Sequence, residues 1–121
     1  MGSVKIGIGF STTRAGLATA DEIATFADAA EDLGIDSLWP SDHVVSRQPS
    51  LDTTALLAFV AARTRRLKLG PSVLVLPPRH PVQVAKAYAT LDHLTGGRRR
   101  VILGVGLGGG KIGRASCRER V

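Results

Sequence analysis

Residues 101–110 read VILGVGLGGG, a short apolar run that breaks into glycines. Such a run is typical of a buried strand that ends at a ligand site, because bare backbone lets N–H groups approach a phosphate or a flat ring. Gly104, Gly106 and Gly109 fit the spacing GxGxxG of dinucleotide sites. That interpretation needs a helix directly after the glycines and a later acidic residue, and a phosphate loop needs Ser or Thr where Ile112 stands. By themselves, the glycines indicate only a strand end near a candidate site.

The residues before this stretch alternate between strand and helix patterns. Strand patterns cover residues 4–10, 36–40, 68–75 and 101–105. Helical spacing covers residues 19–34, which open with a Thr19–Glu22 capping box and end at Gly34. Further helices are predicted over 51–64, with Asp52 in the first turn, and from Pro81 to the glycines at 96–97. The strand patterns begin about 32 residues apart.

This repeat predicts an α/β fold with parallel strands, either an open doubly wound sheet or a (β/α)8 TIM barrel. Eight such units would need about 256 residues, close to the roughly 250 of a typical barrel. We therefore expect residues 1–110 to be the N-terminal part of a truncated TIM barrel, with about three and a half βα units.

The composition is that of a globular protein, with 44% hydrophobic and 21% charged residues. No apolar run reaches the roughly 18 residues of a membrane span, and no secretory signal is seen, so we expect a cytoplasmic protein without a membrane partner. Half of the net charge of +6 lies in residues 111–121, KIGRASCRERV. These residues have no helical or strand period and read like a translated sequencing adapter. We expect a non-native tail there, with a natural basic tail as the alternative.

The strand ends of a parallel fold meet at one edge, which brings residues 10–13, 41–43, 76–80 and 106–110 together. At this edge Asp42 can accept hydrogen bonds and His43 can exchange a proton near neutral pH. The alternative is that Asp42 caps a loop and that His43 is solvated or buried. His80 and His93 have neither the spacing nor the carboxylate partner of a metal site, so no metal is predicted.

Two arginine-rich segments, residues 63–68 and 98–100, precede strands and so fall on the face opposite this site. No aromatic side chains accompany them, which favours a solvated rim over nucleic-acid binding. Trp39 is expected either to pack at the strand end or to form a wall for a ring cofactor.

Several linked motifs resemble the N-terminal part of the bacterial luciferase-like superfamily of flavin- or deazaflavin-dependent oxidoreductases. The motifs are AEDLGIDSLWPSDH (30–43), ARTRRLKLGPSVLVLPPRHPVQVAK (62–86), ATLDHLTGGR (89–98) and LGVGLG (103–108). The resemblance covers residues 3–108 and implies a (β/α)8 barrel. The pattern is closer to members that use coenzyme F(420) than to the light-emitting luciferases, so F(420) is the favoured cofactor and FMN the alternative.

The resemblance also implies roles for particular residues. Asp42 would contact the ring system or the substrate, and His43 would handle a proton at the ring face during hydride transfer. Ser72 and Val73 match a pair often joined by a non-proline cis peptide, which forms a bulge behind the central ring. The backbone that would approach the cofactor is that of Gly106, Leu107 and Gly108.

These expectations describe an oxidoreductase that transfers hydride to or from a small organic substrate or, with FMN, carries out monooxygenation. Gly109 departs from the pattern, because some F(420)-dependent members have an acidic residue there. Either the enzyme lacks that acid or the tail begins at this point. Two alternatives remain open: a catalytically inactive truncated fragment, or a small nucleotide-binding α/β module. A homo-oligomeric parent protein is also left open.

Overall fold

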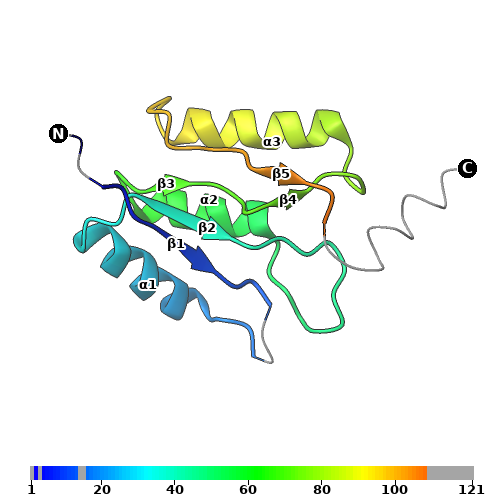
Figure 1. The fold of residues 1–121 in the computed structure, drawn as a ribbon, viewed down its shortest axis with the longest axis horizontal. Coiled ribbons are helices and arrows are strands. Elements are labelled where there is room, and N and C mark those ends of the chain that lie inside the picture. Colours follow the sequence, from blue (N-terminus) through cyan, green and yellow to red (C-terminus); the bar gives the residue numbers. More distant parts are fainter. Residues whose placement is uncertain (1, 3, 14–15, 109–121) are drawn as a thin grey trace, which may run out of the picture.

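The computed structural model describes residues 2, 4–13 and 16–108 (Figure 1). The tail and Gly109, on which two expectations fall, lie outside the described residues. Strands and helices alternate along the chain as β1 (Gly7–Phe10), α1 (Ala20–Asp32), β2 (Ser37–Pro40), α2 (Thr53–Arg63), β3 (Lys68–Leu69), β4 (Leu74–Val75), α3 (Pro81–Leu94) and β5 (Val105–Gly106).

All pairs of named strands are parallel, and each pair joins strands that follow one another in sequence, although β3 and β4 are not paired. β1 pairs with β2, β2 with β3, and β4 with β5. A parallel bridge between Leu69 and Val101 links the two sheets. A doubly wound sheet reverses its strand order at a switch point, whereas a barrel adds each strand on the same side. The observed order is that of a (β/α)8 barrel, in which β3 and β4 share the third strand position.

The predicted strand over 68–75 is broken into β3 and β4, and this corrects the expectation of one continuous strand. Within this segment, the backbone amides of two residues that should face the same neighbouring strand face opposite ones. The amide of Ser72 donates to Pro40 O on β2 at 2.9 Å, whereas the amide of Leu74 donates to Gly104 O at 2.7 Å, next to β5. Pro71 also has no N–H to donate. The strand predicted over 101–105 is likewise shorter, because only the Val101 bridge and β5 have strand pairing.

The helices begin where their caps predict, with one correction. Thr19 forms the capping box with Glu22 at the start of α1, and Pro81 is the first residue of α3. Asp52 is not inside the first turn of α2. It is the N-cap, and its side chain accepts a hydrogen bond from the Ala55 amide at 2.8 Å. Helix α2 therefore begins at Thr53 rather than Leu51.

One face of the sheet packs against the helices and forms the core. In Figure 1, α1 runs below β1 and α3 above β5, with α2 behind the strands between them. Leu38 and Pro40 of β2 are buried on this face. Because side chains alternate along a strand, Ser37 and Trp39 point to the opposite, inner face of the sheet. Gly7 and Gly9 pair with these two residues and share that face.

Candidate functional site

The ends of β1 and β2 meet the segment between β3 and β4 at a wide cleft of ≈ 650 Å³ on the inner face. The cleft joins two of the expected strand ends, 10–13 and 41–43, whereas residues 76–80 and 106–108 are not part of its lining. The cleft is lined by Gly9, Phe10, Ser11, Trp39, Ser41, His43 and Ser72. Two predicted site residues, His43 and Ser72, are therefore brought together. Asp42, Val73 and the glycines of β5 are not part of this lining.

His43 is exposed and points one ring nitrogen at the loop after β1. Its Nδ1 lies 3.0 Å from Thr13 Oγ1, so that nitrogen already has a partner. The other nitrogen, Nε2, is the one through which the ring can exchange a proton with a ligand. The structure thus places an oriented imidazole at the cleft, as the proton-handling role requires, and the role itself stays a prediction.

Asp42 is directed away from the cleft. Its side chain is 1% exposed and accepts a hydrogen bond from the Val75 amide at 2.8 Å. Arg79 Nη2 lies 2.8 and 2.9 Å from its two carboxylate oxygens. The contact with a ring or substrate that the resemblance implies stays a prediction, because in this structure both oxygens are bound within the protein.

The peptide bond between Ser72 and Val73 is cis, which confirms the geometry expected for this pair. Val73 packs against β5, where a Cβ added to Gly106 would lie 2.5 Å from Val73 Cγ2. Gly108 has a φ of +82°, a conformation that favours glycine. Glycine is thus required at both positions, while the approach of residues 106–108 to a cofactor stays a prediction.

Glycines also make room for Trp39 on the inner face. Its indole N–H donates to Ser37 Oγ at 2.8 Å, which fixes the ring. A Cβ on Gly7 would lie 2.7 Å from Trp39 Nε1, and a Cβ on Gly70 would lie 3.0 Å from Trp39 Cζ3. The indole therefore lies across a surface without side chains. This arrangement favours the second expectation for Trp39, a flat wall of the cleft.

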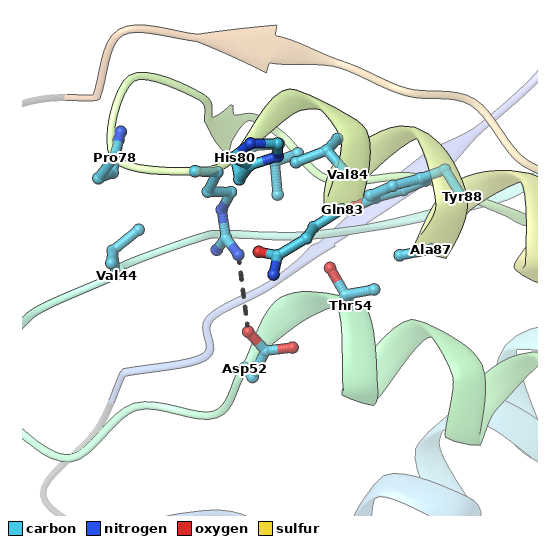
Figure 2. A pocket seen from close by; sticks show the side chains of 11 residues that line it. Val44, Asp52, Thr54, Pro78, His80, Gln83, Val84, Ala87 and Tyr88 are labelled. Carbon is cyan, nitrogen blue, oxygen red and sulfur yellow. Dashed lines mark ion pairs between the residues drawn. The ribbon is translucent and has the colours of Figure 1, made fainter.

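A second pocket, of ≈ 370 Å³, lies between α2 and α3 (Figure 2). Arg79 crosses it, with Nη1 3.9 Å from Asp52 Oδ2. Two buried polar atoms in this pocket, Arg79 Nε and Tyr88 OH, have no hydrogen-bond partner among the described residues. Burial raises the pKa of the Tyr88 phenol, and the nearby Thr54 hydroxyl opposes this rise.

Sequence reasoning missed the importance of Arg79 and Tyr88. Neither residue is distinguished by a local pattern, because Arg79 lies in a proline-rich loop and Tyr88 falls at the helical spacing of apolar residues. A usable signal for Arg79 was its place among Pro77, Pro78 and Pro81, since a stiff loop holds a side chain in one direction.

Only some side chains of the two arginine-rich segments are solvated, as a rim of charged residues would be. Arg63 pairs with Asp28 at 2.6 Å on the surface, as a solvated rim predicts. Arg100, however, is only 6% exposed and donates hydrogen bonds to Thr64 O, Thr64 Oγ1 and Leu67 O, so the expectation of a solvated side chain is wrong there. Within the described ranges, no cluster of His, Cys, Asp and Glu side chains could hold a metal ion, and no helix is long and apolar enough to cross a membrane.

Comparison with known proteins shows which family the chain is similar to. The luciferase-like monooxygenase family model matches residues 4–115. The chain is 44% identical over 94 residues to the F(420)-dependent glucose-6-phosphate dehydrogenase of Kineococcus radiotolerans, covering 72% of this chain and 27% of that enzyme. It is 41% identical over 83 residues to the 4-hydroxyprotoasukamycin monooxygenase of Streptomyces nodosus, covering 68% and 22%.

A solved structure shows the same arrangement over most of the chain. The oxygenating constituent of 3,6-diketocamphane monooxygenase from Pseudomonas putida, in complex with FMN, superposes with a TM-score of 0.80 at 26% identity. The match covers 98% of this chain and 33% of that one. The chain thus spans between 22% and 33% of the length of these three proteins. On the family match and the shared fold, the chain belongs to the luciferase-like monooxygenase family.

Proposed function

We propose that the protein is an oxidoreductase that holds a ring cofactor, F(420) in preference to FMN, in the cleft at the strand ends. One observation carries the proposal: an oriented histidine, His43, and the cis peptide after Ser72 line the same cleft, next to the flat indole of Trp39. A reduced deazaflavin supplies hydride to a small organic substrate, whereas a reduced flavin also supports oxygen chemistry.

The residues present fit a flat ring. Glycine at positions 7 and 70 leaves room for the Trp39 indole on the inner face, and Gly9, where an added Cβ would meet only Trp39 O at 3.9 Å, lines the cleft beside it. A Cβ on Gly70 would overlap the carbonyl oxygen of Ile102, and one on Gly104 would lie 2.6 Å from Pro71 O. The backbone is therefore packed too tightly for any larger residue. The surface that a planar ligand would contact is therefore the Trp39 indole and the bare backbone of Gly9, which both line the cleft.

The chain's own residues would orient the ring and control a proton. Trp39 would form one wall, and the bulge at Ser72 would support the ring from the sheet side. His43, held through Nδ1 by Thr13, would present Nε2 to a substrate oxygen and pass a proton as hydride moves. F(420) is favoured because the motifs resemble F(420)-dependent members and because one 44% identical relative bears that cofactor in its name.

Cofactor titration tests this proposal directly. Trp39 is the only tryptophan, so its fluorescence reports the cleft alone. Adding F(420) should quench this emission and change the ring absorbance, at lower concentrations than FMN requires. The control Trp39→Phe should lose the emission but keep the absorbance change. Tighter binding of FMN would reverse the cofactor preference, and binding of neither would contradict the proposal.

The second candidate is a chain that is catalytically inactive by itself. It is favoured by the share of its relatives that the chain spans, 27% or less of the two enzymes compared in sequence. Cofactor binding without turnover of a reduced cofactor would support this candidate. Turnover of the reduced cofactor with a small aldehyde or ketone, or of the oxidised cofactor with a small alcohol, would contradict it. A homo-oligomeric form of the whole protein is part of the proposal and is tested by its mass in solution.

A further inference from the structure

We infer that Asp42 and Arg79 form a buried clamp that positions His43 over the Ser72–Val73 bulge. The clamp is the set of contacts that joins the Asp42 carboxylate to the Val75 amide and the Arg79 guanidinium. This inference rests on the proposed function, because it assigns Asp42 a positioning role for the same cleft. It replaces the contact with ring or substrate that the sequence resemblance implies for Asp42.

The Asp42 carboxylate accepts a hydrogen bond that a backbone carbonyl of a neighbouring strand would otherwise accept. The amides of Leu74 and Leu76 donate to Gly104 O and Gly106 O, toward β5. The amide between them, on Val75, points the other way, as alternate amides do in a strand. On that side β2 ends at Pro40, and the carbonyl of the next residue, Ser41, accepts hydrogen bonds from Thr12 Oγ1 and Thr53 Oγ1. The Asp42 carboxylate accepts this hydrogen bond instead, at 2.8 Å.

Arg79 makes this substitution possible. A carboxylate with 1% of its side chain exposed is costly unless it is paired, and Arg79 Nη2 contacts both of its oxygens at 2.8 and 2.9 Å. The Arg79 side chain is itself only 20% exposed. The clamp therefore ties together three separate segments: the end of β2, the part of the chain after the bulge, and the loop before α3.

The clamp fixes the position of His43 because His43 directly follows Asp42 in the chain. The backbone on the other side of Asp42 is fixed as well, since Ser41 O accepts hydrogen bonds from Thr12 Oγ1 and Thr53 Oγ1 at 2.9 and 2.7 Å. With Ser41 and Asp42 both held, the His43 ring can keep its contact with Thr13. Release of Asp42 would let the loop from residue 42 onward shift relative to the bulge.

The test compares Asp42→Asn with Asp52→Asn in the full 121-residue chain. Both changes remove one carboxylate next to Arg79, but Asp52 is 55% exposed and Asn still caps α2. The first measurement is the pair of His43 ring ¹⁵N chemical shifts, assigned with His43→Gln. The second is the cofactor dissociation constant from Trp39 fluorescence.

We expect Asp42→Asn to move the His43 shifts toward those of an imidazole that exchanges freely between tautomers. Cofactor binding should weaken by about tenfold, because His43 and the bulge that line the cleft lose their fixed relative position. Asp52→Asn should leave the shifts unchanged and the dissociation constant within about twofold, as expected for an exposed charge. A lower unfolding midpoint with unchanged shifts and binding would show that Asp42 is only structural, and would overturn the inference.

A second pair of variants covers the case in which Asp42→Asn does not fold. Arg79→Lys keeps the charge beside Asp42 and should preserve the His43 shifts, whereas Arg79→Met should reproduce the tautomer exchange. Wild-type shifts in Arg79→Met would overturn the inference. If the wild-type chain binds neither cofactor, the proposed function fails, but the ¹⁵N shifts still decide whether the clamp positions His43.

Discussion

At the scale of single residues, the buried side chain of Tyr88 on α3 affects how the stability of the protein depends on pH. Tyr88 is 7% exposed, and its hydroxyl makes no hydrogen bond of regular geometry among the described residues, although the Thr54 hydroxyl is near enough to lower the pKa of the phenol. A buried polar group without a partner costs free energy, so this position is a weak point of the fold at neutral pH. The same burial raises the pKa of the phenol above its usual value of 10.0.

The raised pKa gives a prediction for alkaline pH. Because the folded state holds the Tyr88 proton more tightly than the unfolded state, the free energy of unfolding falls as pH rises above 10.0. Tyr88→Phe should remove this part of the fall and increase stability at pH 7 by up to about 1 kcal/mol. Urea unfolding of both proteins at pH 7, 9 and 10.5 measures the difference.

Direct titration offers a check on the same residue. Tyr88 is the only tyrosine, so the ultraviolet absorbance of phenolate reports it alone. A midpoint at the usual value, together with identical pH dependence in Tyr88→Phe, would contradict the prediction.

At the scale of secondary-structure elements, side chains from one element complete the hydrogen bonds of another. The Glu31 carboxylate at the end of α1 accepts hydrogen bonds from the amides of Arg65 and Arg66, at 3.1 and 2.6 Å. Arg100, at the start of the fourth strand position, donates to the carbonyls of Thr64 and Leu67 at 3.0 Å. Both fix the turn between α2 and β3, which has few backbone partners of its own.

Arg100 should therefore matter far more than its neighbours in the arginine-rich segment. Arg100→Met keeps much of the volume but leaves two buried carbonyls unpaired, so we expect a loss of about 3 kcal/mol in the free energy of unfolding. Arg98→Met, at an exposed position, should change it by less than about 0.5 kcal/mol. Chemical denaturation of both variants measures this contrast, and equal effects would contradict the role given to Arg100.

Element boundaries show where local sequence is informative and where it is not. The start of α1 was predicted to the residue, because the Thr19–Glu22 box is a local contact three positions apart. The break between β3 and β4 was not predicted as a strand boundary, because it follows from the amides of Ser72 and Leu74 facing opposite neighbours, Pro40 O and Gly104 O, where a regular strand would turn both to the same side. Such an arrangement depends on segments about 30 residues away on either side, which no local pattern encodes.

At the scale of the whole molecule, the described residues form a three-stranded and a two-stranded sheet, linked by the Leu69–Val101 bridge, with helices on one face and outer edges at β1 and β5 (Figure 1). Apolar side chains are exposed beside the second edge, with Leu103 at 42%, Val105 at 51% and Leu107 at 79%. An exposed apolar strand edge is a template for pairing with another chain.

The chain by itself should therefore self-associate. Its weight-average mass in sedimentation experiments should increase with concentration, and Val105→Lys should reduce this increase, because a charged edge residue disfavours strand pairing. Leu94→Lys provides the control, since Leu94 is 72% exposed but lies at the end of α3 rather than on the strand edge. Equal effects of the two substitutions would show that association does not use the edge.

The sequence by itself determined the parallel α/β plan, the three helices, the family and the presence of His43 and Ser72 at one site. These features follow from short-range patterns and from motifs whose spacing is fixed along the chain. Only the tertiary structure decided that Asp42 faces Arg79 rather than the cleft, and that Arg100 is buried. Both contacts join residues 36 to 37 positions apart, so they depend on how separate βα units pack. A charged side chain carries no local signal of its partner, and burial of the pair decides its role.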